Sequence, residues 1–244
     1  VEDSSARAGS VPGPTTSSES PCPTSIAVTS SIPGETSGGS GHNTMATTIG
    51  SVAAATQVHP RDRRTAQQQN THAATAIADT TAFLQSQAAR LTVSPAQLAA
   101  GKLAFTVQVE NFTGHKLPTA FPSRRAWLHV AVTAADGTVV FDSGKLNADG
   151  SIAGNANDAD PTRYSPHYST ITAPSEVEIF EPILGDSQGH VTTGVLSATQ
   201  YLKDNRILPA GFDKATADAD IAVHGKAAAD PNFTAGSSTT QYAV

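Results

Sequence analysis

The fold of this chain is decided by the stretch Asn111-Phe112-Thr113-Gly114-His115-Lys116-Leu117-Pro118-Thr119-Ala120-Phe121-Pro122-Ser123-Arg124-Arg125-Ala126-Trp127-Leu128-His129. Apolar residues occupy every second position from Leu103 to Val109 before it, and again from Ala126 to Val132 at its end. This alternation is typical of strands that bury one face. The stretch is therefore predicted to be an elbow that joins two core strands.

Five residues of this stretch are predicted to give the elbow its shape. Pro118 and Pro122 stiffen the crossing because proline fixes its own backbone angle φ. Trp127, the only tryptophan in the chain, anchors the crossing by burying its large ring. We expect Arg124 or Arg125 to hold a carboxylate of a later loop, since a guanidinium pairs well with carboxylates. An anion- or sugar-binding role for this arginine pair is the alternative.

The rest of the C-terminal part reads as further short strands. The turn Ala135-Asp136-Gly137 predicts a hairpin that leads into Thr138–Phe141, so three successive strands are expected to form an antiparallel core. Residues 144–175 lack any periodicity and predict a long loop, and residues 201–209 predict an irregular crossing. Later strands are expected at Glu176–Phe180, His190–Leu196, Ile221–Gly225 and Gln241–Val244. The predicted fold class is mainly β, an antiparallel β-sandwich over residues 93–244.

The N-terminal part has a different composition. All thirteen aromatic residues lie at or beyond Phe83, and no leucine precedes Leu84. Residues 1–64, rich in Ser, Thr, Gly and Pro, therefore predict a long irregular arm without a core of its own. Such an arm needs support from a neighbouring chain, from a bound cofactor or sugar, or from the C-terminal domain.

Residues 65–92 predict one amphipathic helix. Small and apolar residues recur at three- and four-residue spacings, which gives one weakly apolar stripe. The stripe comprises Ala73, Ile77, Thr80 or Thr81, Leu84, Ala88 and Leu91. We expect this stripe to dock on the β domain.

Charge and composition exclude several classes of protein. The net charge of -6 offers no basic surface for nucleic acid. The sequence contains no run of about 18 apolar residues, so no transmembrane segment is predicted. Cys22 is the single cysteine, so an internal disulfide, a cysteine-based zinc site and a Cys-x-x-Cys-His haem attachment site are all ruled out.

Two histidines are candidate ligands of a haem or a metal. His115 follows a glycine in the elbow, and His167 lies between Pro166 and Tyr168 at the end of the long loop. Hydrogen-bonded corner residues are the alternative reading of both. His129 alternates with the apolar positions of its strand and is expected at the surface or in an interface.

The long loop also contains oxygen ligands of the kind that calcium prefers. The candidate carboxylates are Asp149, Asp158 and Asp160. Their spacing does not match the helix-loop-helix calcium pattern, because Ile152 stands where that pattern has glycine. The alternative is a loop held by its own hydrogen bonds.

Two Asn-Phe-Thr sequons, at Asn111 and Asn232, are candidate glycosylation sites. Together with the scarcity of cysteine, they suggest an extracellular or cell-surface location, with the periplasm as the alternative. No Gly-x-Ser-x-Gly, His-Glu-x-x-His or phosphate-loop motif is present, so the chain is not expected to be an enzyme.

Several short motifs resemble the β-rich C-terminal domain of multihaem c-type cytochromes. They span about residues 80–244 in the family's order. They are Thr113-Gly114-His115-Lys116-Leu117-Pro118-Thr119, Phe121-Pro122-Ser123-Arg124-Arg125-Ala126-Trp127-Leu128-His129, Pro166-His167-Tyr168, Tyr201-Leu202-Lys203-Asp204-Asn205-Arg206, Leu208-Pro209-Ala210-Gly211-Phe212-Asp213-Lys214 and Asp230-Pro231-Asn232-Phe233. The resemblance implies haem c and electron transfer. The chain departs from the family because the upstream Cys-x-x-Cys-His sites are missing.

These observations lead to three hypotheses. The first is an exported, non-catalytic structural or assembly module, such as a subunit of an extracellular filament or surface complex, which associates with itself through the N-terminal arm. The second is an electron-transfer subunit or a fragment of a multihaem cytochrome, with His115 and His167 as haem ligands. The third is a sugar- or calcium-binding module that uses the long loop.

Overall fold

A computed structural model describes residues 6–7, 25–31, 63–119 and 121–244. The chain divides into two compact units, and each is described by itself. Helix α2 (Arg63–Ser86) belongs to one unit, while β1 (Ala6–Arg7), β2 (Ser25–Ser31) and the chain from Arg90 onward belong to the other. Within the described residues the fold is mainly β, as predicted.

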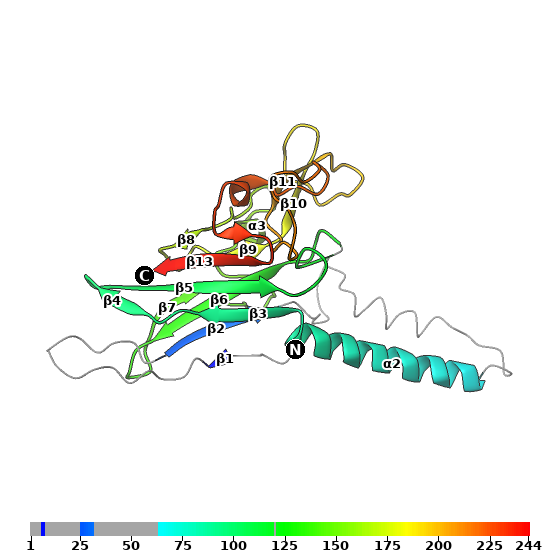
Figure 1. Ribbon diagram of the computed structural model, residues 1–244, viewed down its shortest axis with the longest axis horizontal. Coiled ribbons are helices and arrows are strands. Elements are labelled where there is room, and N and C mark those ends of the chain that lie inside the picture. The colour runs from blue at the N-terminus through cyan, green and yellow to red at the C-terminus, as the bar shows by residue number, and fades with distance from the viewer. Residues whose placement is uncertain (1–5, 8–24, 32–62, 120) are drawn as a thin grey trace. The chain divides into compact units, whose positions relative to one another are not determined.

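The second unit contains two sheets that face each other (Figure 1). Sheet A has the order β1-β2-β6-β7, with β9 also paired to β6. Sheet B has the order β12-β13-β5-β3, with β4 paired to β5 and β8 to β13. The bounds of these strands are β3 (Ala89–Val93), β4 (Gln97–Ala99), β5 (Lys102–Asn111), β6 (Ala126–Thr133), β7 (Val139–Ser143), β8 (Thr170–Ile171), β9 (Ile179–Phe180), β12 (Phe233–Thr234) and β13 (Ser237–Ala243). The registered pairs are antiparallel except for β8 with β13.

The hydrophobic core lies between the two sheets. β5 and β6 bury every second side chain, as the alternation predicted. Phe105 of β5 stacks on Tyr242 of β13, with ring centroids 5.0 Å apart, and Phe141 of β7 meets the Tyr242 ring edge-on. The aromatic contacts thus join sheet B to sheet A.

The prediction of three consecutive paired strands was only half right. β6 and β7 form the expected hairpin, but β5 pairs with β13 in the opposite sheet. The elbow therefore carries the chain from sheet B to sheet A. Alternation identifies a half-buried strand, but it does not identify the strand's partner.

The predicted helix ends earlier than its stripe suggested. The N–H groups of Gln87 and Ala88 both donate to the carbonyl of Phe83 and close the helix, and β3 begins at Ala89. Leu91 and Val93 of β3 pack against the sandwich core. Burial in the sheet thus outweighed the helical spacing. Docking of α2 on the β domain stays a prediction.

Parts of the predicted irregular arm are strands. β2 pairs with seven consecutive residues of β6, and β1 pairs with β2. Backbone pairing does not need bulky side chains, which explains how a segment poor in apolar residues joins the sheet. The other residues of the predicted arm up to residue 62 lie outside the described residues.

The last third of the chain departs most from the prediction. The expected crossing at 201–209 contains β11 (Gln200–Asp204), which pairs with β10 (Pro182–Gly185). The strand predicted over 190–196 does not form, and the tip of that segment is exposed at Leu196. The segment 221–225 contributes only one bridge, from His224 to Asp204, before the 3-10 helix η2 (Gly225–Ala228). The final strand, by contrast, is longer than predicted.

Trp127 anchors the long loop as well as the crossing. Its ring is buried on the outer face of β6 with Ile152, Val177 and Ile179, and its Nε1 donates to the carbonyl of Gly144 at 2.9 Å. The short helix α3 (Ala156–Ala159) lies within this loop. The loop is thus packed as an excursion with its own small core.

Gly144 and Gly150 provide a matched test of this packing. Both have positive φ, but a Cβ on Gly144 would lie 2.3 Å from the carbonyl oxygen of Leu128, whereas a Cβ on Gly150 would meet no atom within 4 Å. We expect Gly150→Ala to cost about 1–2 kcal/mol of stability through backbone strain. Gly144→Ala is expected to cost about 1–3 kcal/mol more through the added clash. Urea unfolding of both variants measures this difference, and equal losses would contradict the described packing.

Candidate functional site

His167 occupies the centre of the most polar buried region of the molecule. Its side chain is 1% exposed. Its Nδ1 lies 2.6 Å from Oε1 of Glu178, and its Nε2 lies 2.9 Å from Oδ2 of Asp230. A neutral imidazole carries only one N–H group, whereas an imidazolium carries two. Because both ring nitrogens face carboxylates, the arrangement fits the charged imidazolium.

The surroundings of His167 act on its pKa in opposite directions. Burial lowers the pKa, because it disfavours the charged ring. The hydrogen bonds and negative charges of Glu178 and Asp230 together outweigh burial and raise the pKa above its ordinary value. The two carboxylates therefore favour the protonated form of His167.

Glu178 is satisfied by several donors besides His167. Its carboxylate accepts hydrogen bonds from the Tyr168 N–H and from Nδ2 of Asn205. Asn205 also donates to the carbonyl of Ile179 and accepts from the N–H of Glu181. Asn205 thus fixes the backbone on both sides of Phe180.

Two further ion groups flank Asn205 in the sequence. Lys203 is 1% exposed, and its Nζ lies 3.0 Å from Oε1 of Glu181. Asp204 accepts from Nζ of Lys116 at 2.7 Å and from the Arg206 guanidinium at 2.8 Å through two nitrogens. Burial raises the pKa of Asp204, but Arg206 and Lys116 outweigh this effect and lower it overall.

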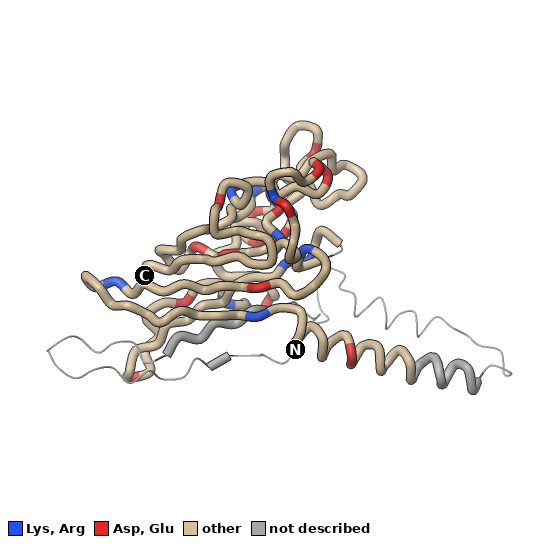
Figure 2. Tube along the Cα trace, viewed as in Figure 1, with Lys and Arg blue, Asp and Glu red and all other residues tan. Residues whose placement is uncertain are grey.

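Together these ion pairs join four cations and four anions, which with Asn205 we call the polar core. Its charged members are Lys116, His167, Lys203, Arg206, Glu178, Glu181, Asp204 and Asp230. The charges balance only if His167 carries its proton. Figure 2 shows acidic and basic positions interspersed in the part of the molecule that carries β10 and β11, while the long strands of the sandwich carry few. An unpaired buried charge is costly, so this balance is a condition for folding.

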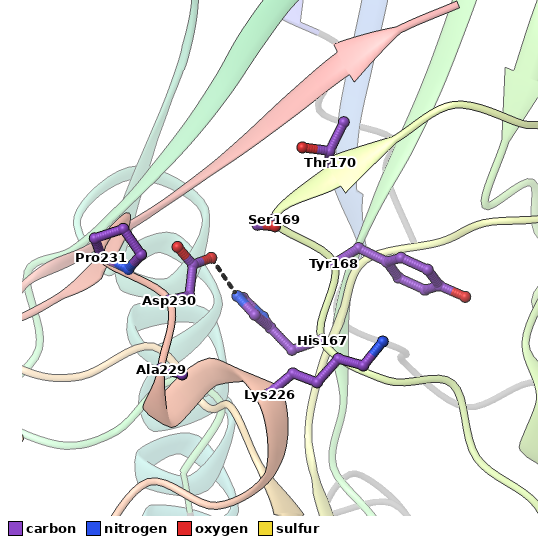
Figure 3. Close-up of a pocket in the computed structure, with 8 residues that line it drawn as sticks. All are labelled: His167, Tyr168, Ser169, Thr170, Lys226, Ala229, Asp230 and Pro231. Carbon is purple, nitrogen blue, oxygen red and sulfur yellow. Dashed lines mark hydrogen bonds and ion pairs between the residues drawn. The ribbon is translucent and has the colours of Figure 1, made fainter.

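A cleft of about 340 Å³ borders the polar core. Figure 3 shows His167 on its wall beside Asp230, with Lys226 alongside. The remaining lining residues are Tyr168, Ser169, Thr170, Ala229 and Pro231. Asp230 uses Oδ2 for His167 and Oδ1 for the N–H of Asn232. The buried His167–Asp230 pair could not exchange a proton with a bound molecule without giving up a structural bond.

The two histidines predicted as haem ligands lie in different environments: His115 is exposed and His167 is buried. His115 is exposed in the elbow, and its carbonyl accepts a hydrogen bond from Asn111. Ligation by His167 would require the loss of a proton and of one carboxylate bond. Haem ligation by either residue stays a prediction. His129 is half-buried and lies 2.8 Å from Asp142, which fits its expected surface position.

The three predicted calcium ligands are used in separate interactions. Asp149 accepts from Ser151, Asp160 accepts from Thr162, and Asp158 accepts from Arg125 and from the N–H of Ile152. Among the described residues, no group of three or more His, Cys, Asp or Glu side chains is placed to hold a metal ion. Each of these carboxylates is bonded to protein groups of its own, and calcium binding by them stays a prediction.

The same contacts confirm the predicted clamp. Arg125 NH1 lies 2.6 Å from Oδ1 of Asp158 and ties the elbow to the long loop. Arg124 instead donates to the carbonyl of Thr119 within the elbow. Pro118 is buried after a cis peptide bond, and Pro122 is half-buried.

Asn111 cannot serve as a glycosylation site in the folded chain. Its side chain is buried, and its Nδ2 donates to the carbonyls of His115 and Ile207. Its Oδ1 accepts from the backbone and hydroxyl of Thr113. This sequon is thus part of the elbow's hydrogen bonding. Asn232 is half-buried, and its glycosylation stays a prediction.

No family model, curated protein or solved structure matches the chain. The residues described include no helix with the length and apolar character needed to cross a membrane. Four of the six motifs that resemble the cytochrome domain nevertheless contribute to the polar core. They supply seven of the nine polar-core residues: Lys116, His167, Lys203, Asp204, Asn205, Arg206 and Asp230. These motifs therefore encode buried ion pairs.

The sequence reading missed Glu178 and Glu181, the other two members of the polar core. They interrupt the apolar run Val177–Ile183, where a charge has no solvent to face. Lys203 in β11 carries the same signal. A charged residue inside an otherwise buried strand could have identified this region, but not which residues pair.

The pH dependence of stability tests the charge of His167. Because the folded pKa is raised, the stabilisation is fully present below the unfolded pKa of about 6.5 and is lost as pH rises through the folded pKa. We expect the free energy of unfolding to fall over this range in the wild type and to fall less in His167→Gln. His129→Gln, which removes a half-exposed histidine beside Asp142, is the control. Urea unfolding between pH 5 and about 9 gives the comparison, and the same slope in wild type and His167→Gln would contradict the assignment.

The pair Lys203–Glu181 tests the cost of an unbalanced charge. Lys203→Met leaves Glu181 buried without its cation and is expected to cost about 3–5 kcal/mol. The double variant Lys203→Met with Glu181→Leu should recover much of this loss, because it removes both charges. Lys226→Met, at an exposed position, is the control and should change little. Chemical denaturation measures all three, and a double variant no more stable than Lys203→Met would argue against the pairing.

Proposed function

We propose that the chain is a non-catalytic, exported structural module that associates with copies of itself. The observation that carries this proposal is that the polar-core side chains are bonded within the protein itself. Its charged side chains bond to one another and to the backbone, and they tie the elbow, the long loop and β9–β11 together. Buried polar groups that are bonded to one another stabilise a single arrangement of the chain, and they are not free to bind a substrate.

Self-association is supported by the fact that β2 comes from the low-complexity N-terminal segment. A segment that cannot bury a core of its own contributes seven residues of backbone pairing to sheet A. A chain that completes its sheet with a strand from a low-complexity segment has a simple means of joining copies. Export is supported by the Ser/Thr-rich composition and the single cysteine.

A second candidate function is electron transfer as part of a multihaem cytochrome. The observation that favours it is that four of the six motifs of the resemblance contribute residues to the polar core. In this reading the β domain is a structural appendage, and the haems belong to a part of the protein that this sequence does not encode. The two candidates differ in an optical property, because haem c absorbs strongly in the Soret region.

Light scattering coupled to size-exclusion chromatography tests the proposed function. We expect the mean mass to rise above the chain mass of 24.9 kDa as the protein concentration rises. A monomer at every concentration would contradict self-association. An absorption spectrum of the same sample is expected to lack a Soret band, and a strong band would favour the cytochrome alternative.

A further inference from the structure

β6 is the central strand of sheet A, and one of its sides depends on β2. Residues Trp127–Thr133 of β6 pair with Ser31–Ser25 of β2. Val130 also pairs with Ser143 of β7, so β2 and β7 lie on opposite sides of β6. Without β2, β6 would present a row of unpaired N–H and C=O groups along seven residues.

An open edge at β6 would be unfavourable for two reasons. Unpaired backbone groups at a sheet edge attract another strand. β6 also carries buried core residues, including Leu128, Val130 and Val132, so the open edge would border the main core. Sheet A thus requires a strand beside β6. In the structure β2 fills this position and pairs with β6 through the backbone in one register.

The covalent connection leaves open which copy of the chain supplies this strand. Thirty-one residues, 32–62, separate the end of β2 from the start of α2. A chain of this length can span at most about 100 Å. Short connections force a strand to pair within its own chain, whereas a connection of this length reaches either its own sheet or that of a neighbour.

Resting on the self-association proposed above, we infer that β2 of one copy pairs with β6 of a second copy. The incoming strand takes the register that β2 holds in the single chain. Because each copy donates one strand and accepts one, two copies that exchange strands with each other form a closed dimer, and exchange with successive copies generates rings or open filaments. At low concentration pairing within the chain prevails, and exchange takes over as the concentration of copies rises.

A proline in β2 tests the exchange. Val28→Pro removes one N–H and restricts the backbone in the middle of the seven-residue ladder. Val52→Pro, outside β2 and within 32–62, is the matched control. We expect Val28→Pro to raise the concentration needed for half-maximal association at least about tenfold, which corresponds to about 1.4 kcal/mol. Val52→Pro should associate as the wild type does.

A synthetic peptide of residues 24–32 completes the experiment. The Val28→Pro chain has a weakened strand of its own and should bind this peptide saturably, with a rise in melting temperature. The same peptide carrying Val28→Pro should not bind. A Val28→Pro chain that binds the peptide, and so has released its own β2, but still associates like the wild type would overturn strand exchange and leave self-association intact, as would failure of the wild-type peptide to bind. A wild type that stays monomeric at all concentrations would instead overturn the proposed function itself.

Discussion

The two bonds of the His167 ring, to Glu178 and to Asp230, are the constraint on which this end of the molecule depends. They join the exit of the long loop, the residue before β9 and the turn before β12, and His167 lies 11 residues from Glu178 and 63 from Asp230 in the chain. Eight charged groups, most of them buried, must reach charge balance, and the proton on His167 completes it. The sequence of the surrounding segments contains few regular strands because ion pairs and Asn205 take over the role of a ladder.

This constraint also changes the meaning of the motifs that resemble a cytochrome domain. Seven polar-core residues lie in those motifs, and their contacts are internal to the fold. Shared motifs of this kind can reflect a shared folding requirement, whether or not a cofactor is present. The contacts show what these residues do within the fold, and the resemblance to the cytochrome family stays a prediction.

At the other side of the sandwich, β2 completes sheet A from a segment without a core, so the two ends of the unit are stabilised by different means.

The predictable part of the fold was the part governed by local pattern. Alternation located β5 and β6, the Asp-Gly turn located β7, and the arginine pair of the elbow gave the clamp of Arg125 on the loop. Pairing between distant segments was not predictable, so β5 was placed beside β6 instead of opposite it. The polar core was missed for the same reason: His167 meets Glu178 and Asp230 only after the chain has folded. The Asp residues proposed for calcium and the sequon at Asn111 matched short patterns, but local hydrogen bonds had already used their side chains.

The central claim is that His167 is a buried imidazolium that balances the polar core. Nitrogen-15 NMR of the histidine side chains in the intact chain tests it most directly, with His167→Gln used to assign the signals. The account predicts that at pH 7 both ring nitrogens of His167 show the shifts of protonated nitrogens, and that both attached protons are protected from exchange with water. A His167 signal with one protonated and one unprotonated nitrogen at pH 7 would contradict it.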